Sequence, residues 1–511
     1  MLTFDRQKVL GKGGFATVYE GTWGGTKVAV KRIVVGDAAT TEQEEMALKM
    51  LDHPNVIKLF HVLENQDFKI FVLEFCDASL DQRFLKEKDP KKYRGPMPPE
   101  TEVLLQLAKG LEYIHQNGLV HRDIKPQNVL IRLNSTTQQV AMKWADFGFS
   151  KQVNERGSFS MSGVRGTYDY FAPEILKLLD DESSTDNEVK KRGTVQSDVF
   201  AEGLVFGYFL LGGVHPFGTL SHQIQINLRT NEPANLPKTG EICDIITEML
   251  EKEPNNRMTS SNVVNRLKNS QMFTLLAKGN PSVEEIEKLI QEGADVNAKD
   301  EKGLTPLLCL AESEKISENL VEIFSLLIQN GANVNSLDSN GNNALLMWCE
   351  NRKQYQNKSF LAIINLFVEN GIDVNCKNIY GNNALTLVCT FYENENLIDI
   401  IRLLIENGID VNCKGKYGWN VLTYLCYSYK KENLIDIIRL LIENGIDVNW
   451  KNRNGHNALT ILCYRYKNKN FIDVITLLIK SGFKVTEETR GFFQRNYKET
   501  NRTEVLQLLH V

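Results

Sequence analysis

The chain has 511 residues, of which 42% are hydrophobic and 24% are charged, and its formal net charge is −5. This length predicts two to four globular domains, and the small net charge gives no overall preference for DNA or for an acidic membrane surface. The most apolar run, 199–214, contains Glu202 and is too short to span a bilayer, so we expect a cytoplasmic protein with no membrane partner. The cysteines form no CxxC pair, which predicts reduced thiols and no zinc site.

The first 35 residues alternate apolar and polar positions around glycines, which predicts twisted hairpin strands. The stretch LGKGGFATVY, 10–19, lies between two of these strands, and its glycines leave backbone N–H groups able to approach phosphate oxygens. Further along, VAVK places Lys31 on a strand, and the helical pattern of 40–51 supplies Glu44 to orient its ammonium group. Together these features predict a phosphate-binding strand region.

From Pro99 to about Leu267 the pattern is mainly helical, with three motifs in a fixed order. HRDIKPQN, 121–128, brings an acid, an amine and an amide within six residues of one another. DFG follows at 146–148 and APE at 172–174. A single fold explains this order and spacing.

A repeated pattern begins beyond residue 270. GADVN starts at 293, GANVN at 331, GIDVN at 371, 408 and 445, and a diverged GFKVT at 482. The steps between these glycines are 38, 40, 37, 37 and 37 residues, a period that indicates a stacked solenoid. Residues 395–412 and 432–449 are the same eighteen residues, ENLIDIIRLLIENGIDVN.

Each unit begins near a glycine with a small-residue helix and closes with an amphipathic helix. The sequence GLTPL at 303–307 matches the G-x-TPL start of the ankyrin repeat, and later copies have Asn-Ala or Asn-Val in place of Thr-Pro. The segment 271–511 therefore resembles an all-α ankyrin-repeat solenoid of about six repeats and a terminal cap. The units exceed the usual 33 residues by about four, and we expect this surplus in the loop between the two helices.

Four cysteines recur eight residues after the glycine, where the ankyrin pattern has alanine. At this position a small, buried core residue is expected, rather than redox or metal chemistry. The four are Cys349, Cys389, Cys426 and Cys463.

The ordered motifs of the first half resemble the eukaryotic protein kinase signature. The resemblance implies an α+β fold of two lobes over residues 1–270, with an N-lobe at 1–76 and a C-lobe at 77–270. It implies ATP and Mg²⁺ as cofactors, with Asp123 accepting the substrate hydroxyl proton and Lys125 neutralising the γ-phosphoryl group. Lys31, paired with Glu44, would hold the α- and β-phosphates. The implied metal ligands are Asn128 and Asp146, and the implied ATP contacts are Leu10, Gly11, Gly13, Gly14, Val18, Ala29, Lys31, Glu74, Cys76, Asn128 and Asp146.

Other positions refine this resemblance. Ala16 replaces the third glycine of G-x-G-x-x-G, while none of the catalytic residues is lost, which favours an active kinase over a scaffold. Lys125 and Thr167 resemble serine/threonine rather than tyrosine kinases. The resemblance also predicts an apolar spine through His121, Phe147, Leu48 and Leu59 that Asp198 anchors. It further implies a structural ion pair of Glu174 with Arg257. The polar loop after Asp146 suggests activation by phosphorylation, with Arg122 pairing with the phosphate, at Ser158, Ser160 or Ser162.

The sequences FVLEFCDASLDQRF, HPNVIKLF and GGVHPFG narrow the resemblance to the kinase domain shared by the inositol-requiring unfolded-protein sensor and ribonuclease L. In that family an endoribonuclease module follows the kinase. Here the last kinase helix, 259–267, leads within a few residues to 271–276, the expected first helix of the solenoid. We therefore expect no metal-independent ribonuclease activity.

Two functions remain open at this point. The first is a serine/threonine kinase whose ankyrin repeats recruit a protein substrate or regulator, and the second is an ankyrin scaffold whose kinase fold acts as a nucleotide-dependent switch. The resemblance also allows a homodimer of kinase domains. Trp419, Arg453 and Phe492 are expected in a row on exposed tips of the solenoid. A protein partner is favoured there over a small nucleotide such as an oligoadenylate.

Overall fold

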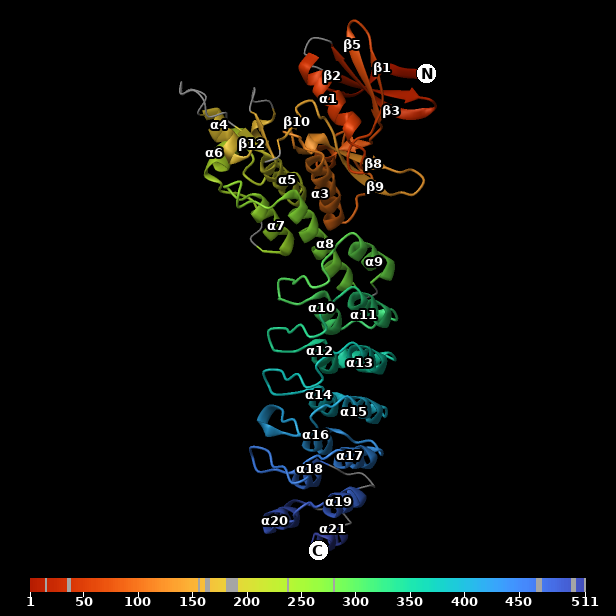
Figure 1. Ribbon diagram of the computed structural model, residues 1–511, viewed down its shortest axis with the longest axis vertical. Coiled ribbons are helices and arrows are strands. Elements are labelled where there is room, and N and C mark those ends of the chain that lie inside the picture. The colour runs from red at the N-terminus through yellow and green to blue at the C-terminus, as the bar shows by residue number, and fades with distance from the viewer. Residues whose placement is uncertain are drawn as a thin grey trace. The chain divides into compact units, whose positions relative to one another are not determined.

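The computed structural model describes residues 1–13, 16–34, 38–154, 157–160, 166–180, 192–236, 239–278, 281–465, 471–497 and 502–509. The chain forms two compact units, Met1–Gln271 and Met272–Val511 (Figure 1). Each unit has its own hydrophobic core. None of the helices in these ranges is both long enough and apolar enough to cross a bilayer.

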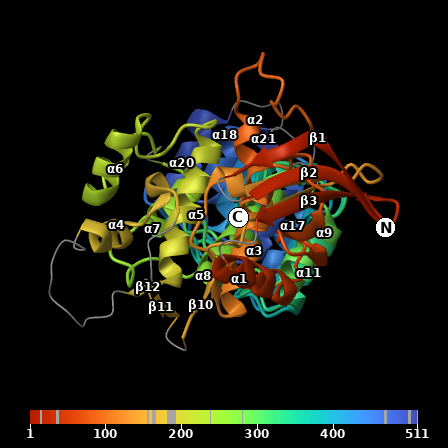
Figure 2. The same ribbon diagram turned by 90° about the horizontal axis from the view of Figure 1, so that it is seen from above.

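The first unit begins with a five-stranded antiparallel sheet in the order β1-β2-β3-β5-β4. Figure 2 shows three of its strands side by side. The central strand β3 carries Lys31, which pairs with Val18 on one side and Phe71 on the other. The strands are β1 (Leu2–Lys12), β2 (Ala16–Trp23), β3 (Thr26–Val34), β4 (Leu59–Glu64) and β5 (Phe68–Glu74), and helix α1 (Ala38–Met50) follows β3.

The remainder of this unit is mainly helical, as the sequence predicts. Its most buried helix, α5 (Val195–Leu210), is covered by neighbours throughout residues 198–207. Gly203 belongs there because a Cβ atom would lie 3.0 Å from the Cβ of Met249. The other helices are α2 (Leu80–Arg83), α3 (Glu100–Gln116), α4 (Pro173–Asp180), α6 (Ser221–Thr230) and α7 (Glu241–Met249).

Short antiparallel strands border the loops between these helices. One sheet has the order β6-β8-β9, and two further pairs join β7 to β10 and β11 to β12. Their bounds are β6 (Ala78–Ser79), β7 (Leu119–Val120), β8 (Val129–Leu133), β9 (Val140–Trp144), β10 (Lys151–Gln152), β11 (Ser158–Ser160) and β12 (Arg192–Thr194), with 3₁₀ turns η1 (Pro126–Asn128) and η2 (Tyr168–Tyr170).

Helix α8 (Ser260–Leu276) differs from the expectation of two helices at 259–267 and 271–276. It is continuous because the intervening residues, Lys268–Ser270, include neither glycine nor proline to end a helix. The prediction of a break there is wrong.

The second unit is a stack of helix pairs. First helices pack against first helices and second helices against second helices of the next repeat (Figure 1). The first helices are α10 (Pro306–Glu312), α12 (Ala344–Glu350), α14 (Ala384–Phe391), α16 (Val421–Ser428), α18 (Ala458–Arg465) and α20 (Glu487–Asn496). The second helices are α9 (Val283–Gln291), α11 (Leu320–Gln329), α13 (Phe360–Glu369), α15 (Leu397–Glu406), α17 (Leu434–Glu443), α19 (Phe471–Lys480) and α21 (Arg502–Leu508).

The exchange of Thr-Pro for Asn-Ala preserves the start of each first helix. The Thr305 hydroxyl accepts a hydrogen bond from the backbone N–H of Leu308, and the Asn383 side chain accepts the equivalent bond from Thr386. Asn and Thr both satisfy the otherwise unpaired N–H groups at a helix start, so the exchange keeps the cap. The surplus residues lie between the two helices, as expected; between α12 and α13 they include the 3₁₀ turn η4 (Arg352–Gln356).

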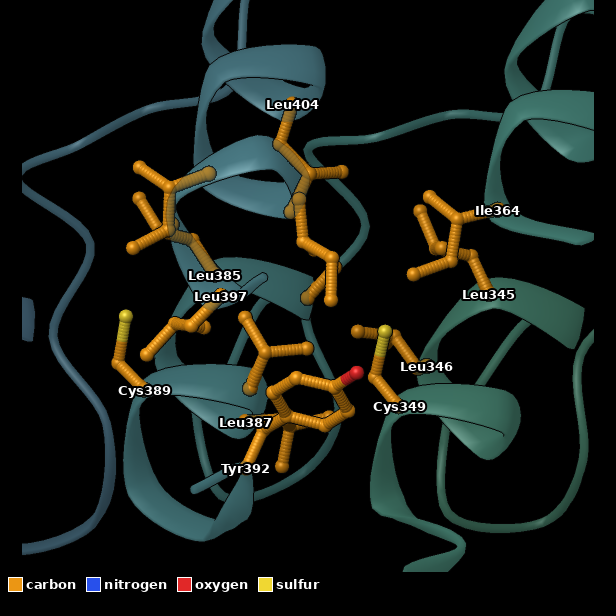
Figure 3. Close-up of a cluster of buried hydrophobic side chains, with 14 of the residues drawn as sticks. Leu345, Leu346, Cys349, Ile364, Leu385, Leu387, Cys389, Tyr392, Leu397 and Leu404 are labelled. Atoms are coloured by element: carbon orange, nitrogen blue, oxygen red, sulfur yellow. The ribbon is translucent and has the colours of Figure 1, made fainter. Parts of the chain in front are cut away.

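The recurrent cysteines lie in the solenoid core. Figure 3 shows Cys349 and Cys389 on the first helices of adjacent repeats, among leucines and Tyr392. Both thiols are buried, and burial raises the pKa of each above its ordinary value, which keeps them protonated. Cys426 and Cys463 are buried in the same way. The predicted core role is confirmed.

The asparagine that ends each DVN motif joins one repeat to the next. The Asn412 Nδ2 atom donates to the carbonyl of Gly445 at 2.9 Å, and its Oδ1 atom accepts from the N–H of Asp447 at 2.8 Å. The same two bonds recur at Asn297, Asn335, Asn375 and Asn449. This inter-repeat asparagine ladder explains why the motif is repeated with so little change.

We predict that Asn412→Ala lowers the free energy of unfolding of the solenoid by about 1–3 kcal/mol, because two backbone groups lose their partner. Urea unfolding of the full chain, followed by circular dichroism, measures the loss. Asn407→Ala is the matched control, since the Asn407 side chain donates to the carbonyl of Leu403 in its own helix rather than to a neighbouring repeat among the described residues. Equal losses in the two variants would contradict the role of the ladder.

Candidate active site

Three charged side chains from distant parts of the first unit meet beside the central strand. Lys31 Nζ lies 2.6 Å from Glu44 Oε1 and 2.8 Å from Asp146 Oδ1. Glu44 comes from α1, and Asp146 comes from the DFG motif that follows β9. The sequence predicted the pair of Lys31 with Glu44, and the structure adds Asp146 to it.

Burial and charge act against each other in this cluster. Burial disfavours a charged ammonium group, yet the attraction of Glu44 and Asp146 together outweighs it and raises the pKa of Lys31. Burial raises the pKa of Glu44, and Lys31 opposes that rise. Asp146 is the exposed member, with 48% of its side chain accessible, and the Lys31 charge lowers its pKa. Lys31 is thus a permanent cation.

The segment HRDIKPQN, 121–128, forms a second cluster around Asp123. Its Oδ2 atom accepts hydrogen bonds from Lys125 Nζ at 2.7 Å and from Asn128 Nδ2 at 2.9 Å. The Thr167 hydroxyl lies 3.0 Å from Lys125 Nζ and donates to Asp123 Oδ1 at 3.3 Å. The amine of Lys125 and the amide of Asn128 therefore both bind the carboxylate of Asp123.

A buried carboxylate on α5 holds this loop in place. Asp198 Oδ2 accepts the N–H of His121 at 2.6 Å, and Oδ1 accepts that of Arg122 at 3.0 Å. Burial opposes ionisation, but the hydrogen bond from His115 and the nearby His121 hold the pKa of Asp198 below its ordinary value. Arg122 has a left-handed backbone, with φ 69°, which costs on the order of 1–3 kcal/mol and persists only where such bonds compel it.

The predicted apolar spine and structural ion pair are present. The rings of His121 and Phe147 lie 4.9 Å apart, and Phe147 is fully buried. Arg257 makes two parallel contacts with Glu174, at 3.0 and 3.1 Å. These interactions fix the DFG motif and the helix after APE.

The expected nucleotide contacts outside the two charged clusters lie on β1, β2, β3, the end of β5 and the residues next to these strands. The glycine turn closes with the N–H of Gly13 donating to the carbonyl of Ala16 at 2.8 Å. Leu10 and Gly11 lie on β1, Val18 on β2 and Ala29 on β3. Gly14 lies outside the described residues.

The end of β5 shows an interaction that the sequence did not indicate. Glu74 is buried, and its carboxylate forms ion pairs with Arg132 and Lys143. Its side chain therefore serves the fold, and a ligand contact would fall to its backbone. Burial raises the pKa of Cys76 to about 12, so this thiol is neutral.

The expected phosphorylation loop is only partly described. Ser158 lies on β11, where its hydroxyl is 3.0 Å from Asn154 Oδ1. Ser162 and the side chain of Ser160 lie outside the described residues. The Arg122 guanidinium lies 5.0 Å from the ring of buried Phe159, so the side chain expected to meet a phosphate also contacts an aromatic ring.

The row of exposed residues expected on the solenoid is not formed. Trp419 is half-buried against the rings of Tyr424 and Tyr427, each 5.3 Å away. Phe492 lies within α20 and packs against the core. Arg453 alone of the three is exposed. The prediction of an exposed row was wrong because the residue after each repeat glycine lies next to or within a first helix. Its side chain there turns toward the solenoid core.

The donors expected to bind a metal ion fit Mg²⁺. Asn128 uses its Nδ2 atom toward Asp123, which leaves an amide oxygen, and Asp146 offers a partly exposed carboxylate. Hard oxygen ligands of this kind are those that Mg²⁺ prefers. The chemistry of the two side chains therefore agrees with the site that the sequence predicted.

We predict that Lys31→Met lowers the free energy of unfolding by about 3 kcal/mol at pH 8, because it leaves the buried Glu44 charge with no cation. The deficit should be smaller at pH 5 than at pH 8, because burial raises the pKa of Glu44 and the carboxylate takes up a proton as the pH falls. Urea unfolding at the two pH values measures this. The second variant Lys31→Met/Glu44→Gln should lose the pH dependence; if it keeps it, another group is responsible.

Comparison with known proteins follows the same division of the chain. The protein kinase domain matches residues 4–267, and ankyrin repeats in sets of three match residues 273–378, 355–452 and 391–489. The serine/threonine-protein kinase/endoribonuclease ire-1 of Caenorhabditis elegans is 33% identical over 275 residues, and IRE2 of Homo sapiens, of the same description, is 34% identical over 273. The serine/threonine-protein kinase VIK of Arabidopsis thaliana is 28% identical over 285 residues.

Each of these alignments covers 52% of this chain. They cover 27%, 28% and 60% of the respective relatives, so the chain spans little more than a quarter of the first two. A protein kinase domain uses ATP. The kinase match extends over more than half of the chain and includes both charged clusters. The chain therefore belongs to the protein kinase family, and it carries an ankyrin-repeat solenoid after its kinase domain.

Proposed function

We propose that this protein is a serine/threonine kinase that transfers the γ-phosphoryl group of ATP, with Mg²⁺, to a protein substrate that its ankyrin repeats recruit. The observation that carries the proposal is the arrangement of Asp123, Lys125, Asn128 and Thr167 in one hydrogen-bonded cluster. The named activities of the relatives support the kinase part. In the family that the sequence resembles, an endoribonuclease module follows the kinase, whereas residues 281–465 here form the helices of ankyrin repeats. We therefore do not propose RNA cleavage as an activity.

Asp123 is placed to receive the proton of the substrate hydroxyl. Its Oδ2 atom is held by Lys125 and Asn128, while Oδ1 accepts the longer contact from Thr167. A substrate hydroxyl can replace that contact, and Thr167 then remains bonded to Lys125. The two oxygens thus have separate tasks: one orients the carboxylate and the other accepts a proton.

The ammonium groups of Lys31 and Lys125 would stabilise the negative charge of the transferred phosphoryl group. Lys31 is held by Glu44 and Asp146, and Lys125 is held by Asp123 and Thr167. Asn128 and Asp146 would hold Mg²⁺, which supplies further positive charge to the phosphate oxygens when bound. Because the transferred group carries spread negative charge, such fixed cations stabilise the transition state without reorganisation.

The first prediction for this function is that Asp123→Asn lowers the rate of phosphotransfer by on the order of 10²-fold or more, because amide replaces the proton acceptor. Incorporation of radiolabelled phosphate into a generic protein substrate measures it. Asp146→Asn should have a comparable effect through loss of the metal ligand. Equal incorporation by wild type and Asp123→Asn would exclude the kinase and leave a nucleotide-dependent scaffold.

The second prediction concerns the loop that carries Ser158, Ser160 and Ser162. We expect active protein to carry phosphate on this loop, and we expect phosphatase treatment to reduce its activity, since a phosphate near Arg122 would order the segment. Mass spectrometry before and after treatment locates the phosphate. Fully active protein with no phosphate on any of the three serines would show that Phe159 and the β11–β12 pair suffice to hold the loop.

A further inference from the structure

Three consecutive tips of the solenoid line an open groove of about 580 Å³. These tips are residues 376–381, 413–418 and 450–455, which precede the first helices α14, α16 and α18. The residues that give the groove its chemistry are Ile379, Tyr380, Lys414, Trp450, Lys451 and Arg453. We call it the basic groove.

Positive charge is concentrated at these three tips. They contain five lysine or arginine residues and no aspartate or glutamate, namely Lys377, Lys414, Lys416, Lys451 and Arg453. The corresponding tip at 298–303 instead mixes two lysines with Asp300 and Glu301, and the tip at 336–341 has Asp338 and no cation. Acidic residues outside the tips also approach this charge: Asp410 lies 3.5 Å from Lys377, and Glu488 lies 2.9 Å from Lys451.

Apolar surface is exposed beside this charge. Ile379 is 65% exposed and Tyr380 is 48% exposed, so two large apolar side chains stand next to each other at one rim. Neighbouring bulky apolar groups of this kind gain free energy when a partner covers them. A partner therefore needs an apolar side chain as well as negative charge.

The aromatic rings of the groove already have cations over them. Lys414 Nζ lies 3.6 Å from the centroid of the Trp450 ring, and Lys416 Nζ lies 5.2 Å from that of Tyr380. The Trp450 indole N–H donates to the carbonyl of Gly418 at 2.7 Å, which fixes the ring. One face of each ring is therefore covered by an ammonium group, which removes that face from stacking with a nucleobase. This favours a carboxylate-bearing protein segment over a nucleic acid.

We propose that the basic groove binds an extended acidic segment of a partner protein that also carries an apolar side chain. The proposal rests on the proposed function, because it specifies which protein segment the ankyrin repeats recruit. Packed helices lie about 8–10 Å apart, so neighbouring tips are separated by about that distance. An extended chain in the polyproline II conformation rises about 3.1 Å per residue with three residues per turn, so every third side chain points to the same side. Carboxylates at every third residue therefore match successive tips, with the apolar side chain between them directed to Ile379 and Tyr380.

The test uses the full chain and two fluorescein-labelled heptapeptides of equal composition. One has glutamates at its first, fourth and seventh positions with leucine and serine between them, and the other has its three glutamates adjacent. Fluorescence anisotropy measures binding. We expect saturable binding of the spaced peptide that weakens with added salt, and weaker binding of the adjacent peptide.

Charge reversal at the groove provides the decisive comparison. Lys414→Glu/Arg453→Glu should weaken binding of the spaced peptide about tenfold, since exposed ion pairs each contribute a few-fold and reversal adds repulsion. Lys299→Glu is the matched control, because Lys299 has the same place in its repeat as Lys414 but lies outside the groove. It should leave the affinity within about twofold. Ile379→Ser should weaken binding while leaving its salt dependence unchanged.

Three results would overturn the proposal. They are failure of the spaced peptide to bind, equal affinity of the double variant and the Lys299→Glu control, and tighter groove-dependent binding of inorganic polyphosphate or oligoadenylate than of the peptide. Phosphotransfer is measured on the same preparations with a generic substrate. Its absence in the wild type contradicts the proposed function, whereas failure of peptide binding with normal phosphotransfer contradicts only the basic groove.

Discussion

The hydrogen bonds that Asp198 accepts from two successive backbone N–H groups are the constraint on which the active site depends. They hold Arg122 in a left-handed conformation that it would not adopt alone. With the chain turned there, His121 meets Phe147 on one side, and Asp123 reaches Lys125 and Asn128 on the other. A residue on a buried helix thus determines where the Asp123 carboxylate lies.

The stacking of the solenoid repeats depends on different interactions. Its repeats are joined by the asparagine ladder and by contacts between like helices, so each repeat depends mainly on its two neighbours. This leaves the tips free to vary in charge while the ladder stays the same. Glu301 in one tip corresponds to Lys416 in another, and both side chains are exposed, so this change of charge costs no core contact.

The sequence predicted the kinase motifs and the repeats because each is a local pattern of fixed spacing. Lys31 with Glu44, and Glu174 with Arg257, were found in this way. Other features depend on which distant segments the fold brings together. The pairing of Glu74 with Arg132 and Lys143 and the contact of Arg122 with Phe159 left no signal in spacing. Trp419 was misplaced because an aromatic residue beside a glycine suits both a tip and a core.

The identical stretches 395–412 and 432–449 have a consequence for how the chain reaches this structure. They form equal helices, α15 and α17, and each is fastened by the same pair of asparagine bonds, from Asn375 and Asn412. During folding, either stretch can therefore dock in the place of the other, one repeat out of step, without losing those bonds. The unlike first helices, with Leu387 in α14 and Tyr424 in α16, distinguish the two alignments. Correct alignment of the repeats during folding therefore depends on the helices whose sequences differ most.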